Sequence, residues 1–276
     1  MLSEQQQTET LEVDLLLNGV ANRYGYDFRG YARSSLTRRI RQAANKEGAP
    51  TISALQERVL HDPNAMLRFI ERIAVHTTSM FRDADVYQAL RRDVIPLLRT
   101  YPFVRIWHAG CSSGEEVYSL AILLHEAGIY DRVRLYATDI SDAVVERARR
   151  GIFPLPSIRE YTVAYQSAGG QSEFSDYYET DAHRAVIRHW LRRNVVFSVH
   201  NLVCDSVFNE FHLILCRNVM IYFGPELRER VHGVLSSSLG KFGLLVLGKK
   251  ESLRFSAVAS QFHEIGSNLQ MYRRIP

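Results

Sequence analysis

The spacing of apolar residues changes near residue 100 of the chain. Before that point apolar residues recur at intervals of three and four, as in Leu11, Leu15 and Leu16. This spacing is typical of amphipathic helices, and no strand-like run interrupts it. We therefore predict a small all-helical domain over residues 1–85, followed by a linker helix over 86–102.

From residue 103 onward, short apolar runs alternate with helical stretches. FVRIWHAG (103–110) and VRLYATD (133–139) are each followed by a helical pattern. Such alternation is typical of βαβ units and predicts a parallel sheet. We expect an α/β domain over 103–276, with further strands within 194–202, 211–223 and 243–250.

The stretch 154–193 breaks this alternation. It is aromatic and polar, and AVIRHW (185–190) is its one convincing strand. We therefore expect a small subdomain to be inserted here.

The amino-acid composition mainly excludes classes of protein and kinds of site. With 46% hydrophobic and 23% charged residues in 276, the chain has the composition of a folded globular protein. Cys111, Cys204 and Cys216 are far apart, and the histidines show no metal-binding spacing, so we expect neither a disulfide framework nor a metal site. The polar N-terminus and the lack of a long apolar run favour a cytoplasmic protein without membrane insertion. We expect a monomer.

The most informative segment is AGCSSGEE (109–116), which links the first predicted strand to the first crossover helix. Doubly wound folds bind nucleotides at this point, although an ordinary tight turn has a similar sequence. Glu115 and Glu116 at the helix start would repel a pyrophosphate and suit a cationic group. An ammonium-bearing ligand such as S-adenosylmethionine therefore fits better than a dinucleotide.

Polar residues also follow two other predicted strands. Asp139 ends the second strand, where it can accept hydrogen bonds from ribose hydroxyls, cap the helix starting near Asp142, or do both. Arg217, Asn218 and Tyr222 follow the strand run that begins at 211. They either line the crevice at the sheet edge or belong to a turn and the core.

One predicted helix is strongly basic, with six basic residues within eighteen and no acid before Glu47. This run is either a solvated face, a docking surface for an acidic protein, or a nucleic-acid surface. No aromatic residues are interleaved for base stacking, which disfavours nucleic acid.

Together, these segments resemble the CheR-type chemotaxis receptor methyltransferases, which transfer a methyl group from S-adenosylmethionine to receptor glutamates. The resemblance covers almost the whole chain. It is carried by the basic helix and by TTSMFRD (77–83), AGCSSGEEVYS (109–119), YATDIS (136–141), HNL (200–202) and CRNVMIYF (216–223). It implies a helical N-terminal domain whose basic helix, about 30–47, binds the receptor. A Rossmann-like α/β methyltransferase domain with a small β-subdomain follows.

The resemblance also implies roles for individual residues. Glu116 should hold the cofactor's amino group and Asp139 its ribose hydroxyls. The other expected cofactor-binding residues are His76, Thr78, Arg82, Ala109, Gly110, Asn201, Leu202, Arg217 and Asn218. Catalytic roles fall to Arg82 and Tyr222, and substrate binding to Arg33, Arg38, Arg39 and Arg41.

The implied chemistry needs little acid–base help. A glutamate with an ordinary pKa of about 4.3 is ionised at neutral pH and can attack the sulfonium methyl group. During the transfer, the negative carboxylate and the positive sulfonium become a neutral ester and a neutral thioether. An arginine bound tightly to the carboxylate would therefore stabilise the ground state more than the transition state and slow the reaction. We therefore expect Arg82 to orient the substrate. Tyr222 can donate a hydrogen bond to the oxygen that does not attack.

Three positions depart from the family pattern: Val117 replaces a proline, His76 an asparagine, and Lys249-Lys250 a His-Ser pair. These departures leave the protein substrate open. The alternatives are a silent, cofactor-sensing adaptor, a methyltransferase for another acidic protein, and a nucleic-acid or small-molecule methyltransferase on the same fold.

The expected partner is the cytoplasmic methylation region of a chemoreceptor. Family members that tether to a receptor's C-terminal peptide carry a Gly-x-Gly insertion in the β-subdomain, whereas DYYETDAHRAVIRHW (176–190) contains no glycine. We expect the edge strand near Ala185 to lack the peptide groove. The enzyme should then not depend on a receptor C-terminal pentapeptide.

Overall fold

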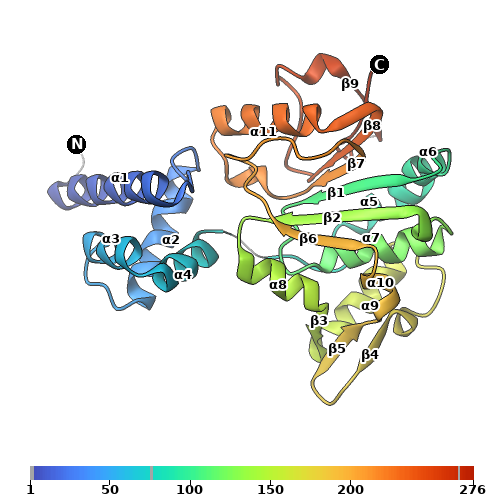
Figure 1. Ribbon diagram of the computed structural model, residues 1–276, viewed down its shortest axis with the longest axis horizontal. Helices are drawn as coiled ribbons and strands as arrows, with labels where there is room; N and C mark the ends of the chain where they lie inside the picture. Colours follow the sequence, from blue (N-terminus) through green and yellow to red (C-terminus); the bar gives the residue numbers. More distant parts are fainter. Residues whose placement is uncertain (1–2, 75–76, 267) are drawn as a thin grey trace.

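The structure is a computed structural model that describes residues 3–74, 77–266 and 268–276. A helical bundle at one end of the molecule adjoins an α/β domain (Figure 1). The bundle consists of α1 (Glu4–Tyr24), α2 (Arg33–Lys46), α3 (Ile52–His61) and α4 (Pro63–Ile73). Its helices enclose a core of their own, which includes Leu16, Ile40, Val59 and Phe69.

Side chains in the short connections begin the last two helices of the bundle. Thr51 accepts a hydrogen bond from the Ala54 N–H at 3.0 Å, and Asp62 accepts one from the Asn64 N–H at 2.9 Å. Pro63 occupies the first turn of α4, where its missing N–H costs no helical hydrogen bond.

A continuous helical stretch leads from the bundle to the sheet. It comprises α5 (Ala84–Ala89), the π-helical turn η1 (Leu90–Val94) and α6 (Ile95–Leu98). It overlaps most of the segment 86–102 in which we predict a linker helix.

The central sheet has seven strands in the order β6-β2-β1-β7-β8-β10-β9. The strands from β6 to β8 are parallel, whereas β10 is antiparallel to both β8 and β9. The alternation of strands and helices predicts the parallel part. It cannot predict the last two strands, because no helix separates them. The bounds are β1 (Val104–Ala109), β2 (Val133–Asp139), β6 (Val195–Val199), β7 (Phe211–Cys216), β8 (Leu239–Leu247), β9 (Phe262–Gly266) and β10 (Met271–Arg274).

Alternate residues of the central strands pack into two different cores. Ile106 and Leu213 belong to one core with residues of α7 (Glu115–Glu126) and α8 (Asp142–Arg150). Trp107 and Ile214 belong to the other with residues of α11 (Pro225–Ser237). This alternation follows from the period of two along a strand. Helices therefore cover both faces, and the strand ends remain available for a site.

The inserted subdomain contains a three-stranded antiparallel sheet in the order β3-β5-β4. Ala185 lies in the central strand, so the expectation that it belongs to an edge strand is wrong. The predicted strand 185–190 also ends early, at Ile187, and a helical turn follows. The elements are β3 (Ile152–Pro154), α9 (Ile158–Ser167), β4 (Tyr178–Thr180), β5 (Arg184–Ile187) and α10 (His189–Arg192). The subdomain also contains the short 3-10 turns η3 (Leu155–Ser157) and η4 (Phe174–Tyr177), and three more lie elsewhere: η2 (Tyr130–Arg132), η5 (Met220–Tyr222) and η6 (Ala259–Gln261).

Backbone hydrogen bonds fasten the helical bundle to the α/β domain. The Ala32 N–H donates to the Tyr222 carbonyl at 2.8 Å, and the Gly224 N–H donates to the Gly30 carbonyl at 2.6 Å. Between them, the rings of Tyr31 and Phe223 meet edge-to-face at 4.9 Å. The residues before α2 thus run beside the segment after η5.

Three further findings concern the described residues. All three cysteines are free. Within the described ranges, no group of three or more His, Cys, Asp or Glu residues is placed to hold a metal ion. Of the helices that the structure describes, none has both the length and the apolar character needed to cross a membrane.

Candidate functional site

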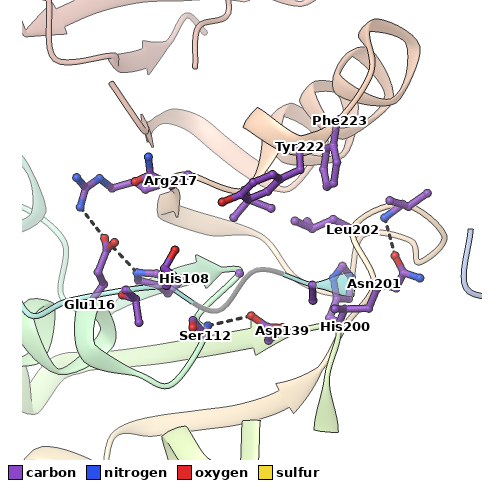
Figure 2. Close-up of a pocket in the computed structure, with 18 of the residues that line it drawn as sticks. His108, Ser112, Glu116, Asp139, His200, Asn201, Leu202, Arg217, Tyr222 and Phe223 are labelled. Atoms are coloured by element: carbon purple, nitrogen blue, oxygen red, sulfur yellow. Dashed lines mark hydrogen bonds and ion pairs between the residues drawn. The ribbon is translucent and has the colours of Figure 1, made fainter. Parts of the chain in front are cut away.

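A cleft lies at the carboxyl ends of β1, β2 and β7, and the helical bundle contributes one of its walls. Figure 2 shows Tyr222 across the cleft from Ser112 and Asp139, with Glu116 and Arg217 at one end. This is the position at which open parallel sheets bind ligands. Nine of the predicted cofactor-binding residues line it: Thr78, Arg82, Gly110, Glu116, Asp139, Asn201, Leu202, Arg217 and Asn218.

Two predicted residues stand apart from this set. Ala109 is fully buried at the end of β1 and packs in the core, so its side chain does not line the cleft. Its neighbour Gly110 does. His76 lies outside the described residues.

The loop after β1 is shaped by its backbone. Gly110 has a φ of +74°, and a Cβ added there would lie 2.3 Å from the Cγ2 of Val219. Only glycine therefore fits this close approach. The N–H groups of Gly110 and Cys111 both donate to the Thr138 carbonyl at 2.8 Å, which ties the loop to β2.

The same loop positions Asp139. The Ser112 N–H donates to Oδ2 of Asp139 at 2.9 Å, and the Ser141 N–H approaches Oδ1 at 3.4 Å. Ser141 is the residue before α8. Asp139 therefore contacts the start of this helix while also lining the cleft, so the two roles considered for it are compatible.

Glu116 and Arg217 form a buried ion pair at one end of the cleft. Oε2 of Glu116 accepts from Nη1 of Arg217 at 2.5 Å, and Nη2 of Arg217 donates to Oδ2 of Asp83 at 2.6 Å. Burial raises the pKa of Glu116, and the guanidinium of Arg217 opposes that rise. Arg217 occupies only one oxygen of Glu116, so Oε1 remains for a cationic group of a ligand.

Arg39 belongs to the cleft, although it comes from the basic helix α2. Its guanidinium lies 4.7 Å from the centre of the Tyr222 ring, and its Nη1 donates to the Ile73 carbonyl at 2.7 Å. The residue is only 8% exposed, and this burial lowers the pKa of its guanidinium. Arg39 is therefore placed to act on the cleft and Tyr222, not on an outer receptor-facing surface.

The basic run of α2 is partly compensated in space, so our view of it as uncompensated is wrong. Arg33 pairs with Asp14 at 2.6 Å, and Arg41 pairs with Glu9. Both acids lie on α1. Among the described residues, Arg38 alone of the four predicted substrate-binding arginines is exposed and makes no ion pair.

Sequence reasoning missed several residues of the site. His108, near the end of β1, lines the cleft, and neither ring nitrogen has a hydrogen-bond partner among the described residues, although Nε2 lies 3.9 Å from Oε2 of Glu116. Burial lowers its pKa to about 3, so the ring is neutral at neutral pH. Its polar side chain at a strand end is a signal that could have been used. Tyr31 also lines the cleft, but only the packing of the two domains brings it there.

Glu251 was missed because it acts behind the cleft. Its carboxylate accepts from the N–H groups of Gly248, Asn218 and Met220 at 2.7, 2.9 and 2.7 Å, and from that of Ile221 at 3.2 Å. These bonds hold the segment that carries Asn218 and leads to Tyr222. A Cβ on Gly248 would lie 2.7 Å from the Asn218 nitrogen, so glycine is needed there too.

The cleft has the polar groups that a charged nucleoside ligand needs. Within the described structure, the Ser112 hydroxyl, the Asn218 Oδ1 atom and the His108 ring nitrogens are buried without hydrogen-bond partners. Buried polar atoms are usually satisfied, so these orphaned groups point to a polar ligand. Glu116 suits a cationic head group and Asp139 suits hydroxyls.

Comparison with known proteins decides the family. The model described as "CheR methyltransferase, SAM binding domain" matches residues 76–270, and "CheR methyltransferase, all-alpha domain" matches residues 11–74. The chain belongs to the CheR methyltransferase family. The predicted family and fold class are thus confirmed: an all-helical domain precedes an S-adenosylmethionine-dependent methyltransferase domain. The CheR assignment also confirms the predicted cofactor, S-adenosylmethionine, and the enzyme class.

Several relatives resemble this CheR chain over most of its length. "Putative methyltransferase Cher3" of Pseudomonas putida is 44% identical over 264 residues, which cover 96% of this chain and 97% of the relative. "Chemotaxis protein methyltransferase" of Listeria monocytogenes is 29% identical, covering 83% and 85%. Magnesium protoporphyrin IX methyltransferase from Synechocystis with bound SAH is a remote structural match, with 16% identity, a TM-score of 0.32 and coverage of 69% and 68%.

Two of the departures from the CheR pattern can be placed in the structure. Val117 is buried in the core at the start of α7. Lys249 donates to Oδ2 of Asp85 at 2.7 Å and lies 3.8 Å from Oδ1 of Asp83. Lys249 thus braces the segment that also contacts Arg217.

Proposed function

We propose that this enzyme transfers the methyl group of S-adenosylmethionine to glutamate side chains of chemoreceptors. The products are glutamate methyl esters and S-adenosylhomocysteine. The observation that carries this proposal is the grouping of Arg39, Arg82 and Tyr222 along the cleft. Two cations and a phenol next to a cofactor cleft favour an anionic acceptor. The names of relatives such as "Chemotaxis protein methyltransferase" support the same acceptor.

In this proposal the cofactor is held from both ends. Bound S-adenosylmethionine supplies an electrophilic methyl group on a sulfonium centre. Glu116 would hold the cofactor's ammonium group, and Asp139 would accept hydrogen bonds from its ribose hydroxyls. Thr78 and Arg82 close the cleft from the segment that follows the bundle, and Asn218 and Leu202 contribute its other walls.

The acceptor glutamate needs orientation and no general base. Its carboxylate is ionised at neutral pH because its ordinary pKa is about 4.3. Arg82 and Arg39 attract it, and the Tyr222 hydroxyl donates to the oxygen that does not attack. Arg39 is already bonded to the Ile73 carbonyl and stacked on Tyr222. Such an engaged cation orients the carboxylate without clamping it, which limits stabilisation of the ground state.

The partner is the cytoplasmic methylation region of a receptor, bound by a monomeric enzyme in the cytoplasm. Arg38 on α2 contacts its acidic surface. Tethering by a receptor C-terminal pentapeptide is not needed. The outer strand β4 has only three residues, Tyr178–Thr180, and Glu179 on it pairs with Arg188 at 2.9 Å. A short, charged edge is a poor template for an added strand.

A methylation assay tests the proposal. The purified enzyme is incubated with labelled cofactor and receptor cytoplasmic fragments, and the base-labile label of an ester is measured. We expect labelling that disappears when the acceptor glutamates are changed to alanine. Cofactor binding without transfer would indicate a silent adaptor, and label in RNA or in another acidic protein would overturn the receptor assignment.

A further inference from the structure

A second hollow lies beside the cleft, outside the cofactor site. Its volume is about 410 Å³, and its walls come from η5, α11 and the loop that follows β8. We call it the Phe255 hollow and define it by Ile221, Arg228, His232, Lys250, Arg254 and Phe255. Ile221 directly precedes Tyr222, so the short turn η5 contributes one residue to the cleft and its neighbours to this hollow.

The backbone at Phe255 is strained in a way that keeps its side chain exposed. The Ser256 N–H donates to the Leu253 carbonyl at 3.0 Å, which closes a four-residue turn. Phe255 is the third residue of this turn and has a φ of +68°. That position favours glycine or asparagine and penalises a bulky residue. The ring is nevertheless 95% exposed, so burial does not offset the strain.

The turn is held rigidly in this conformation. Ser252 accepts from the Arg254 N–H at 3.0 Å. Glu229 on α11 accepts from the Ala257 N–H at 2.8 Å and from the Ser256 hydroxyl at 3.1 Å. A strained, exposed aromatic residue on a braced turn is typical of a functional contact.

The rim of the hollow is cationic. Among the described residues, Arg228, Lys250 and Arg254 form no ion pair with a carboxylate. Glu251 is the acid of the lining, and its oxygens are already engaged by backbone N–H groups. The guanidinium of Arg254 lies 5.8 Å from the centre of the Phe255 ring.

The floor of the hollow contains an unsatisfied polar group. His232 on α11 is 6% exposed, and its Nδ1 atom has no partner among the described residues. Such a group points to an occupant that supplies a hydrogen bond. The hollow therefore combines the buried polar group of His232, the apolar side chains of Ile221 and Phe255, and three cations.

We propose that the Phe255 hollow docks an acidic segment of the protein substrate, near the glutamate that is methylated. This inference rests on the proposed function. The three rim cations match the acidic residues of such a segment, and Phe255 and Ile221 pack against its apolar residues. Because Ile221 precedes Tyr222, docking here delivers an adjacent glutamate to the cleft.

Docking at the hollow is also consistent with the charges on α2. Two arginines of α2 are paired with acids of α1, and Arg39 is buried. The unpaired cations of the Phe255 hollow therefore add to the attraction that Arg38 provides from the other domain. Contacts at Arg38 and at the hollow together fix the orientation of the bound substrate.

Two variants test the docking surface with a chemoreceptor cytoplasmic fragment as substrate. Phe255→Asn removes the aromatic side chain and fits the turn better. The double variant Lys250→Glu/Arg254→Glu reverses the rim charge. We expect each to raise KM for the fragment roughly tenfold with kcat within about twofold, because interface side chains of this kind carry much of the binding energy. Affinity for S-adenosylmethionine, measured by calorimetry, should stay unchanged.

Matched controls are available outside the hollow. Phe103 is 51% exposed just before β1, so Phe103→Asn tests loss of an exposed ring. Arg159→Glu/Lys241→Glu reverses two exposed cations outside the hollow. These controls should keep the wild-type KM. The melting temperature of Phe255→Asn should equal or exceed that of wild type, since asparagine tolerates the positive φ.

The outcomes separate the two proposals. A wild-type enzyme that methylates no receptor fragment overturns the proposed function. A wild type that methylates receptors while both variants keep its KM overturns the docking surface alone. The docking surface is also overturned if the variants lower kcat without raising KM, or if the controls raise KM equally.

Discussion

Glu251 stabilises the site without lining the cofactor cleft. Its carboxylate collects four backbone N–H groups, three of them from the segment between Asn218 and Ile221. Burial raises its pKa, and the backbone donors oppose this rise. A single side chain therefore fixes the backbone that presents Asn218 to the cleft.

We predict that Glu251→Ala lowers the free energy of unfolding by about 2–3 kcal/mol, because buried N–H groups lose a charged acceptor. It should also weaken S-adenosylmethionine binding through disorder of the loop. Thermal denaturation and calorimetry measure the two effects. Glu264→Ala, at an exposed position of β9, is the control and should change neither. Full cofactor affinity in the Glu251 variant would contradict the assigned role.

Within the cleft itself, we predict that Glu116→Gln weakens cofactor binding by about 1.5–3 kcal/mol, the usual range for a hydrogen bond to a charged group. Titration calorimetry gives the dissociation constant. The adjacent Glu115 is an apt control, since it is also buried but bonds to the Ser113 hydroxyl. Equal losses in Glu115→Gln and Glu116→Gln would show that Glu116 has no special contact with the cofactor.

At the level of elements, Glu47 joins two helices of the bundle. It follows α2, and its carboxylate accepts from Arg68 at 2.8 Å and from Arg72, both on α4. These hydrogen bonds lower the pKa of Glu47 to about 2. The Glu47 side chain is 11% exposed, but both arginines are partly exposed, so solvent screening reduces the energy.

We predict that Glu47→Gln lowers the free energy of unfolding by about 1–2 kcal/mol at pH 7. Because the folded-state pKa is depressed, this stabilisation is present above the unfolded pKa of about 4.3 and is lost as pH falls toward 2. The difference between variant and wild type should therefore shrink from pH 5 to pH 3 in chemical denaturation. Glu57→Gln, exposed on α3, serves as the control. A gap independent of pH would refute the ion-pair origin.

The elements also show what local sequence pattern can predict. Periodicity gave the helices and the parallel strands, and the rule that ligands bind at strand ends predicted Gly110, Glu116 and Asp139 as lining residues. Local sequence pattern did not reveal that α1 supplies acids to Arg33 and Arg41, nor that Ala185 lies in a central strand. Those facts depend on which elements meet in space. Arg39 and Tyr31 were missed as cleft residues for the same reason, because only packing between domains brings them to Tyr222.

At the scale of the whole molecule, the subdomain with β4 as an outer strand bears on how the enzyme finds its substrate. If the proposed function holds, we predict that deleting the last residues of the receptor leaves the methylation rate within about twofold, because the short, charged strand β4 is a poor site for a tether that would raise the effective concentration to the millimolar range. Initial rates with full-length and truncated receptor fragments measure this. A collapse of the rate on truncation would instead reveal a tether.

The contact between the helical bundle and the α/β domain has a consequence for replacing one bundle with another. The hydrogen bonds from Ala32 to Tyr222 and from Gly224 to Gly30 use only backbone atoms. A backbone contact of this kind tolerates changes of side chain. A relative's helical bundle could therefore be grafted onto this catalytic domain if the stretch 30–32 keeps its path. Chimeric enzymes built at this seam would carry a new α2 while keeping the backbone hydrogen bond to Tyr222.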